Sequence, residues 1–590
     1  MSANFTQAME SCNINDSENI PGDDESTLDR STARTWNNAV SNPSPDSTGE
    51  TAGRLALFFK SVRGLGGNRL QAYLEKAYAE NPRDTFLIAF HIRDCRGGKG
   101  EREIGRAALR WLSRDKERFR AVIQHIAEYG RWDDYLTLIQ PLEKPKPSRK
   151  SKSGAVKAKS PGDEVIAFID GLDEARKKEL ASVSDPELVD ALIGAFADQL
   201  KRDLCSMNEG KPCTLAAKWA PTENCALDRK YDAVAKIAKT LAVSKRNYRK
   251  QYLAPLRAYL KVVERYMCHK NWEAIDYSAV PSCAMKRLKK AFAKNDATRF
   301  EEWKAKLQKG EVKVNAKQLY PHELVREVYA SSENVVSEAQ WKVLVEETKK
   351  LGVFEKSAVV VDVSGSMGTM GASSFCPLHA SVALGLIISE CIQGPLRDHI
   401  ITFHELPSFH LVEGSTLKER IGSLVQASWG GSTNFQAIFD LILSRAKKHE
   451  LKQEDMPRTL YVLSDMQFNS AMSMKGEEKT NYQTVRDKYQ AAGYQPPDII
   501  FWNLNGQSTD FPCTTNDFGT AMISGFSTAI LKSILSLGKV EPLDVMRASI
   551  EAARYEPISR SLRPFEPEEK METKEEAPSG WFGGWFGSKA

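Results

Sequence analysis

The chain has 590 residues, of which 41% are hydrophobic, and a formal net charge of +5. This length allows about two to four domains with sizeable cores, and the mild positive charge does not by itself predict a nucleic-acid partner. The ten cysteines show no C-x-x-C pair and no regular spacing, which excludes a zinc ribbon and a secreted disulfide framework.

The beginning of the chain, Met-Ser-Ala-Asn-Phe-Thr, has neither a basic segment nor an apolar one, so we expect no signal peptide. No window reaches about 18 uninterrupted apolar residues, so we expect no membrane span either. Together with the cysteine usage, these features predict an intracellular protein, in the cytoplasm or alternatively in the nucleus.

Residues 1–50 are rich in Ser, Asn, Asp, Thr and Pro, a composition typical of disordered chain. Apolar residues at helical spacing begin in Arg54–Phe59 and recur through residues 51–350, for example in Asn68–Tyr78. Successive helices with short turns predict an all-α domain of the solenoid type. No strict period is visible, so any repeat is degenerate.

A Gly-Gly-Lys-Gly loop at 97–100 precedes a predicted helix that starts at Arg102. The backbone amides of such a loop, together with Lys99, would hold a phosphate group, although the spacing of a Walker loop is missing. The alternative is an interhelical turn with a solvated basic face. Further along, Lys245, Arg246 and Arg249 form a basic helix with interleaved aromatic residues, which fits RNA contact as well as a plain polar face.

Residues 143–162 form a basic insertion, with seven Lys or Arg between Lys144 and Lys159 and no acidic residue there. Such a run is typical of a flexible loop or linker. It would add salt-sensitive phosphate contacts if the protein bound RNA, but a solvated insertion is the simpler interpretation.

In the second half, the apolar run Ala358–Val361 ends in Asp362-x-Ser364-x-Ser366. The run is short and is bounded by charge on one side and by Gly365 on the other, which predicts a buried strand of a parallel sheet. Its polar residues then lie at the carboxyl end of the strand, where open α/β sheets bind their ligands. One carboxylate and two hydroxyls are hard oxygen ligands, with too little charge to satisfy a divalent cation alone.

Two later segments complete this arrangement. A threonine stands in a Gly-rich loop ahead of a predicted helix, and an aspartate follows a second buried strand, Thr459–Leu463. The order Asp-x-Ser-x-Ser, Thr, Asp resembles the metal-ion-dependent adhesion site of von Willebrand factor A domains. By this resemblance the metal site consists of Asp362, Ser364, Ser366, Thr433 and Asp465. The three hydroxyls would contact the metal, and the two carboxylates would hold it directly or through water.

Few charges and three hydroxyls suit Mg²⁺ or Mn²⁺ better than Ca²⁺. The alternative is an A-type domain that binds no metal. Strands alternate with helices over residues 355–540, which predicts a doubly wound, Rossmann-like α/β domain. No G-x-G-x-x-G follows the first strand, so a dinucleotide ligand is not expected.

Residues 541–590 are predicted to contain one helix, Leu543–Tyr555, followed by a disordered tail with a mixed-charge run. The tail ends in a repeated aromatic pair between Trp581 and Phe586. These aromatic residues would dock to a partner or a membrane surface, or alternatively pack on the protein itself.

The segment Arg-Asp-x-Arg-Gly-Gly-Lys-Gly-Glu-Arg at 93–102 is followed by Tyr-Gly-Arg-Trp-Asp-Asp at 129–134. These residues resemble the TROVE domain of Ro autoantigen-type proteins. The resemblance implies a ring of HEAT-like helical repeats that binds structured small RNA and is followed by an A-type domain. Trp-Gly-Gly-x-Thr-Asn-Phe, Leu-Ser-Asp-Met-Gln-Phe and Phe-Trp-Asn-Leu resemble a family that joins two such halves. The candidate RNA contacts are Arg96, Lys99, Arg102, Lys245, Arg246 and Arg249.

We therefore expect a non-enzymatic binding protein of the ribonucleoprotein type. Its helical domain would bind structured RNA, and its A-type domain would bind a protein carboxylate through the metal. One alternative is a protein-interaction scaffold without an RNA role. The other is a metal-dependent hydrolase, which is disfavoured because Ser364 replaces a second acid two residues after Asp362. No Ser-His-Asp or Cys-His set is evident in the sequence either.

Overall fold

The structure is a computed structural model. It describes residues 50–142, 174–331, 334–351, 354–372, 374–403, 406–427, 434–467, 481–507, 511–512, 519–530 and 541–566, together with the short strands β1 (Ala33–Arg34) and β2 (Val40–Ser41). The predictions made for the basic insertion, for Thr433 and for the aromatic segment 581–586 lie outside the described residues, as do most of residues 1–50.

Strands β1 and β2 pair in an antiparallel ladder, with Ala33 opposite Ser41. The prediction that residues 1–50 lack regular structure is therefore wrong at these strands. The composition of a 50-residue window does not detect a ladder as short as this one.

The helical half begins with a group of short helices. Asn81 caps one of them by accepting a hydrogen bond from the Asp84 N–H at 2.9 Å, and Pro82 occupies its first position, where its missing N–H is not needed. The helices of this group are α2 (Ala52–Lys60), α3 (Gly67–Glu80), α4 (Pro82–Arg93), α5 (Arg102–Leu112), α6 (Lys116–Val122), α7 (Ile126–Tyr129) and α8 (Asp134–Thr137).

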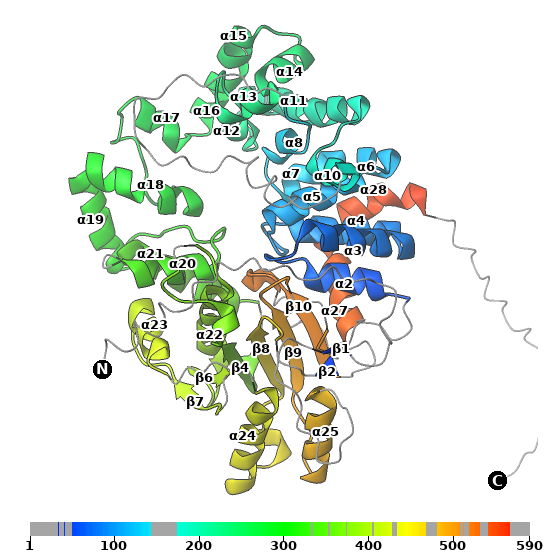
Figure 1. The fold of residues 1–590 in the computed structure, drawn as a ribbon. Coiled ribbons are helices and arrows are strands. Elements are labelled where there is room, and N and C mark those ends of the chain that lie inside the picture. The colour runs from blue at the N-terminus through cyan, green and yellow to red at the C-terminus, as the bar shows by residue number, and fades with distance from the viewer. Residues whose placement is uncertain are drawn as a thin grey trace, which may run out of the picture.

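More helices follow in an arc (Figure 1). They are α10 (Glu174–Ala181), α11 (Pro186–Asn208), α12 (Ala216–Trp219), α13 (Ala226–Tyr231), α14 (Ala233–Thr240), α15 (Lys245–Asn247), a π-helical turn (Tyr248–Leu253), α16 (Ala254–Tyr259), α17 (Val263–Cys268), α18 (Ser282–Asn295), α19 (Ala297–Gln308), α20 (Pro321–Ala330) and α21 (Val335–Lys349). One core extends from α2 to α16, and a smaller one holds α17 to α19 together. The predicted all-α half is thereby confirmed.

The C-terminal half contains a six-stranded sheet in the order β10-β9-β8-β4-β6-β7. Its strands are β4 (Ser357–Asp362), β6 (His399–Phe403), β7 (Phe409–Leu411), β8 (Thr459–Ser464), β9 (Asp498–Asn503) and β10 (Thr520–Ser524). All neighbouring pairs are parallel except β6 and β7, which are antiparallel. The edge strand β7 was not expected from the sequence, because it is only three residues long and partly exposed.

Side chains alternate between the two faces of this sheet, so that neighbouring residues enter different cores. Val359 and Val361 pack in the core that contains α22 (Pro377–Cys391), whereas Ala358 and Val360 pack in the core that contains α24 (Phe435–Lys448) and α25 (Asn481–Ala491). Helices therefore cover both faces, which confirms the predicted doubly wound α/β architecture. The remaining elements of this half are α23 (Leu417–Val425) and a two-stranded pair, β3 (Phe354–Glu355) with β5 (Ile392–Gln393).

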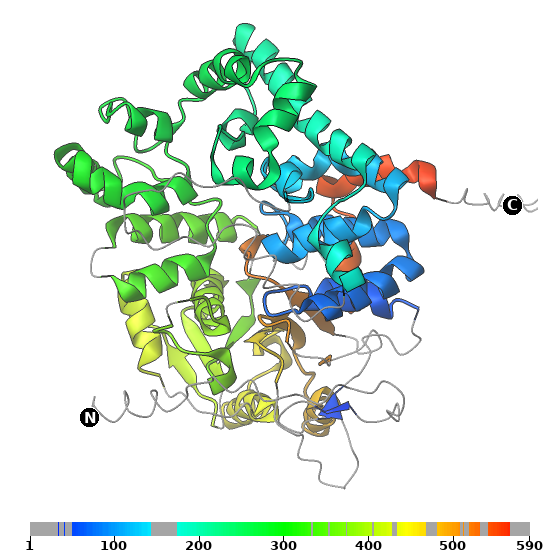
Figure 2. The ribbon, with the colours of Figure 1, turned by 45° about the horizontal axis from the view of Figure 1, so that its top comes forward.

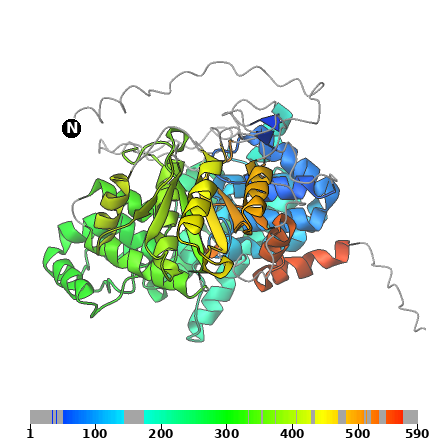
Figure 3. The ribbon, with the colours of Figure 1, turned by 90° about the horizontal axis from the view of Figure 1, so that it is seen from below.

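The sheet domain closes the arc of helices. At one end of the arc, α20 and α21 pack on α22, and at the other end α2 packs on β10 (Figure 1). Seen from below, the strands lie between the green helices on one side and the blue helices on the other (Figure 3). Residues in and just after α2 belong to all three large cores: Phe58 to the helical core, Val62 to one side of the sheet, and Phe59 to the other.

The segment after the sheet returns to the N-terminal helices. It contains α27 (Pro542–Ile550), a 3₁₀ turn (Ala553–Tyr555) and α28 (Glu556–Leu562), of which α27 contacts α4 and α28 contacts α6. The red helix α28 lies beside the blue helices in Figure 2. The single helix predicted over Leu543–Tyr555 is therefore two elements with a break. The expectation of a tail after it is wrong up to residue 562, because α28 buries Ile558 and Leu562.

We predict that removal of residues 541–590 unfolds the helical half, whereas removal of residues 567–590 alone leaves it folded. The longer deletion takes Met546, Ile550, Tyr555, Ile558 and Leu562 out of the helical core. Each such side chain contributes about 1.5–3 kcal/mol, so their sum is comparable with the whole stability of a domain. Limited proteolysis and thermal unfolding of the two truncated chains measure this difference. Equal unfolding midpoints would contradict the packing described here.

Candidate metal centre

Four of the five predicted metal ligands are described, and they lie at one point of the sheet. The chain leaves β4 towards β6 on one side, and later returns to β8 on the other side of β4. Ligands of open α/β sheets bind at the carboxyl ends of the strands where the strand order reverses in this way. Asp362 is the last residue of β4, and Asp465 follows the last residue of β8.

Hydrogen bonds connect the polar groups of this centre. The Asp362 carboxylate accepts the Ser364 N–H at 2.9 Å through Oδ1 and the Ser464 hydroxyl at 2.5 Å through Oδ2. The hydroxyls of Ser364 and Ser366 are 3.1 Å apart. The Asp465 carboxylate accepts hydrogen bonds from the Ser366 hydroxyl and, at 3.2 Å, from the backbone N–H that follows Met466. Ser464 is a member of the site that sequence reasoning missed, although its place at the end of a buried strand was visible.

A left-handed turn sets the position of the second carboxylate. Met466 has a φ of 68°, and its N–H donates to the Ser464 hydroxyl at 3.1 Å. This conformation is uncommon for a residue with a side chain and is found where surrounding structure enforces it. Here it bends the chain directly after β8, so that Asp465 stays beside the end of β4.

The two carboxylates are buried, with no compensating positive charge among the described residues. Asp362 is fully buried and Asp465 is 3% exposed. Burial, together with the nearby charge of Asp465, raises the pKa of Asp362 to about 7, and burial also raises the pKa of Asp465. Within the part of the chain that the structure describes, neither carboxylate forms an ion pair. A divalent cation would supply the missing charge, so this donor set fits the predicted metal.

The centre is open on one side. Ser366 is exposed, whereas Ser364 is only 3% exposed. Among the described residues, no three His, Cys, Asp or Glu side chains converge as a complete metal cage. The described ligands are therefore two carboxylates and several hydroxyls, a set that leaves coordination positions for water or for a ligand from outside.

Lys99 is not available to an RNA phosphate, which corrects the sequence prediction. Its side chain is 1% exposed, and its ammonium group donates to the Phe58 carbonyl and, at 2.7 Å, to the Ser524 hydroxyl. Burial lowers the pKa of Lys99 to about 7. The glycines around it serve close packing, because a Cβ at Gly98 or Gly100 would collide with neighbouring oxygen atoms. The loop is a buried junction and not a phosphate cradle.

The other candidate RNA contacts are on the surface, at two separate places. Arg96 is exposed, but its guanidinium donates to the Glu128 carbonyl at 2.6 Å. Arg102 pairs with Glu103 at 3.0 Å and lines a crevice of 740 Å³. Lys245, Arg246 and Arg249 are exposed, on α15 and the turn after it, and make no ion pair among the described residues.

A Cys–His pair lies near the metal centre, although none was evident in the sequence. The Cys376 thiol is 3.2 Å from Nδ1 of His379, whose Nε2 is 3.0 Å from the carbonyl oxygen of Met370. Burial raises the pKa of the thiol and lowers that of the imidazole, so both groups stay neutral near pH 7. A reactive cysteine needs the opposite shifts, so this pair is an interior hydrogen bond at the start of α22.

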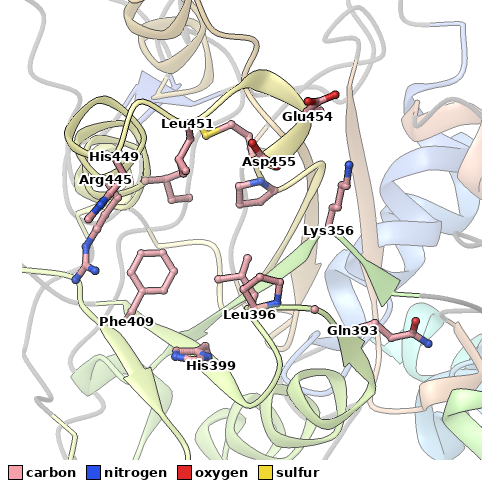
Figure 4. A pocket seen from close by; sticks show the side chains of 15 residues that line it. Lys356, Gln393, Leu396, His399, Phe409, Arg445, His449, Leu451, Glu454 and Asp455 are labelled. Atoms are coloured by element: carbon pink, nitrogen blue, oxygen red, sulfur yellow. The ribbon is translucent and has the colours of Figure 1, made fainter.

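A cavity of 780 Å³ lies at the other end of the sheet, away from the carboxyl ends of β4 and β8 (Figure 4). Leu396, Phe409 and Leu451 line it, and Lys356 lies at its rim just before β4. Because these residues lie at the amino ends of the strands, the cavity is separate from the carboxylates. No helix among the described residues is both long and apolar enough to cross a membrane.

Comparisons with known proteins cover most of the chain. A family model described as a domain of unknown function, DUF2828, matches residues 186–354, and a second one, DUF7788, matches residues 356–575. The chain is 31% identical over 540 residues to "Uncharacterized protein L728" of Acanthamoeba polyphaga mimivirus, with 87% of each chain covered. A solved structure of the RO (RSR) protein of Deinococcus radiodurans is similar at 15% identity and a TM-score of 0.32, over 75% of this chain and 91% of that one. A score this low carries no argument about function.

We predict that Lys99→Met removes part of the pH dependence of folding. The pKa of Lys99 falls from 10.5 to about 7 on folding, so the unfolded chain binds more protons between these values. Stability contributed by this group therefore rises with pH in that window, by about 1.4 kcal/mol per pH unit. Urea unfolding of the unmodified chain and of Lys99→Met between pH 7 and 10 measures how the free energy of unfolding changes with pH. Lys290→Met, which replaces an exposed lysine, is the control. Parallel slopes for all three chains would show that Lys99 is not charged differently on folding.

Proposed function

The chain belongs to the family of protein L728 of Acanthamoeba polyphaga mimivirus, and we propose that its sheet domain binds a protein carboxylate through a divalent metal ion. The observation that carries this proposal is the pair of buried carboxylates at the point where the strand order reverses. Two negative charges held together in the interior destabilise the fold unless a cation accompanies them. Hydroxyls beside them provide further oxygen ligands of the kind that hard cations prefer.

In this proposal, Asp362, Ser364, Ser366 and Asp465 hold Mg²⁺ or Mn²⁺, and Thr433 is a further ligand implied by the sequence resemblance to A-type domains. Mg²⁺ takes six oxygen ligands and seldom receives all of them from one protein. The ion supplies a Lewis-acidic positive charge at the exposed side of the centre, beside Ser366. An Asp or Glu side chain of a partner protein is the ligand whose charge and size suit that position.

We propose binding and not catalysis. Ser364 occupies the position where a second acid would assist phosphoryl transfer after Asp362. The nearby thiol of Cys376 is kept neutral by burial, so it is a weak nucleophile. The alternative is a metal-dependent hydrolase. Assays of hydrolytic turnover with the metal-loaded protein would test it.

For the helical half, we propose binding of structured RNA. The support is the group of exposed basic residues at α15, where Lys245, Arg246 and Arg249 have no acidic partner among the described residues. Uncompensated Lys and Arg side chains on one surface are the electrostatic footprint of nucleic-acid binding. The TROVE-like motifs of the sequence point to the same ligand. The competing proposal is a protein scaffold without RNA. It is favoured by the crevice of 740 Å³, where arginines pair with acids, as Arg102 does with Glu103.

We predict that Asp362→Ala abolishes divalent-ion binding and any metal-dependent partner capture. One of the two described carboxylates at the centre is removed, and Asp465 with the hydroxyls carries too little negative charge to hold the ion. Mn²⁺ binding followed by electron paramagnetic resonance, with Mg²⁺ as competitor, measures the affinity. The matched control is Asp440→Ala, which removes an exposed carboxylate paired with Lys488 at 2.8 Å. Unchanged Mn²⁺ affinity in Asp362→Ala would refute the metal assignment.

We predict that the full chain crosslinks to discrete structured RNAs in cells. The variant Arg246→Glu/Arg249→Glu is expected to reduce the crosslinked RNA by about tenfold or more, because two phosphate contacts become repulsive. The charge-matched control Lys447→Glu/Lys448→Glu alters two exposed residues of α24 on the sheet domain and is expected to crosslink normally. Lys99→Met is also expected to crosslink normally. No enrichment of RNA over background for the unmodified chain would leave the scaffold as the better account.

A further inference from the structure

A second site lies in the helical half, in a cavity of 470 Å³ between the end of α5, the start of α6 and the connection from α10 to α11. Arg110, Trp111, Arg114, Ser182 and Ser184 are among the residues that line it. Its volume lies within the range of about 300–1,000 Å³ that is typical of small-molecule sites. The cavity is far along the chain from the metal centre, and nothing derived for that centre bears on it.

Arg110 is a buried guanidinium that forms no ion pair with a carboxylate of the described residues. Its side chain is 2% exposed, and its two terminal nitrogens donate to the carbonyls of Thr137 at 2.9 Å and Leu180 at 3.3 Å. Its Nε has no acceptor, and no acidic group of the described chain lies within ion-pair distance of it. Burial and the nearby charge of Arg106 lower its pKa to about 10. A charge buried in this way is costly unless an anion accompanies it.

A second guanidinium and several neutral hydrogen-bond donors also line the cavity. The guanidinium of Arg114 stacks on the Trp111 ring at 4.7 Å, is exposed, and pairs with no acid of the described residues. The indole N–H of Trp111 is buried and has no acceptor. Ser182 and Ser184 also line the cavity, and their hydroxyls make no hydrogen bond to described groups. All of these groups can donate to an oxyanion.

The acidic residues of the cavity are already engaged. Asp185 pairs with Lys116 at 2.5 Å and caps α11 by accepting the Leu188 N–H at 3.1 Å. Glu179 accepts a hydrogen bond from Gln71 at 3.3 Å. Glu179 is exposed and keeps its charge, but it forms an ion pair with neither arginine. Among the described residues, Arg110 and Arg114 therefore remain as two guanidinium groups that line one cavity without an ion-pair partner.

We propose that this cavity binds the phosphate group of a small phosphomonoester. A phosphomonoester carries a charge close to −2 near pH 7, which matches the two unpaired arginines, and its three terminal oxygens match the fork-shaped donors and the hydroxyls around them. A carboxylate carries one charge and would leave one guanidinium uncompensated. The volume beyond the phosphate accommodates the organic part of the ligand. This inference does not rest on the metal site or on RNA binding.

Isothermal titration of the full chain tests the proposal with three probes: inorganic phosphate, adenosine 5′-monophosphate and adenosine. Both phosphate-containing probes are expected to bind, and adenosine is not. Tighter binding of the monophosphate than of inorganic phosphate identifies a phosphomonoester as the ligand class, whereas tighter binding of inorganic phosphate overturns that assignment. Equal binding of adenosine and its monophosphate, or no binding of any probe, overturns the proposal as a whole.

The variants Arg114→Gln and Arg110→Met separate this site from general charge effects. Arg114 is exposed, so its replacement by Gln is expected to leave the fold intact and to weaken phosphate binding by about tenfold, the value of one charge-assisted hydrogen bond. Arg110→Met is expected to weaken it further, and Ser184→Ala replaces this variant if Arg110→Met fails to fold. The matched control is Arg120→Gln, on α6, which loses an exposed arginine paired with Glu187.

The control variant is expected to bind phosphate like the unmodified chain. An equal loss in Arg114→Gln and Arg120→Gln would show nonspecific attraction and would overturn the proposal. Arg114→Gln is also expected to bind Mn²⁺ and to crosslink to RNA normally, so that failure here is distinguishable from failure of the function proposed for the other two sites.

Discussion

The structure depends on a buried polar junction that joins the N-terminal helices to the last strand of the sheet and to the C-terminal segment. Lys99 donates to carbonyls at the end of α2 and to Ser524 at the end of β10, while Asp94, five residues earlier, accepts from Arg554 at 2.9 Å and from Tyr555 at 2.9 Å. Groups buried as deeply as these are costly when unpaired. Lys99 is satisfied only when α2 and β10 are in place, and Asp94 only when the C-terminal segment is. The junction therefore couples the formation of the helical arc to that of the sheet.

This closure also decides which parts of the sheet remain accessible. An uncovered edge strand offers unpaired backbone groups to other chains, and here α2 covers the β10 edge, while the opposite edge is the short strand β7. Helices cover both faces of the sheet. The carboxyl ends of β4 and β8 remain, and there the loop that carries Ser366 reaches the surface. The candidate metal centre thus lies at a point where the sheet reaches the surface.

The distribution of charge distinguishes structural from functional polar groups. In the crevice of 740 Å³ that Arg102 lines, arginines have acidic partners, for example the half-buried Arg131 with Asp133 at 2.7 Å, so their charges are used within the fold. Asp362 with Asp465, and Arg110 with Arg114, are different, because each pair concentrates charge of one sign without a described partner. Proteins retain such unfavourable arrangements chiefly where a ligand compensates them. This contrast is the common basis of the metal and phosphate proposals.

The sequence by itself determined the elements with strong periodicity and the polar residues at strand ends. The helix that begins at Arg102 was predicted at its observed first residue, and Asp362 and Asp465 were assigned to the ends of two buried strands, because buried strands and helix starts have local signatures. Only the tertiary structure decided the environment of each side chain. Lys99 follows two glycines in a loop that looks exposed in sequence, yet packing from β10 and α2 buries it. Arg110 looks like an ordinary helical arginine until residues about 70 positions away enclose it. Burial and the identity of the nearest charge arise from contacts between distant segments, so no local pattern encodes them.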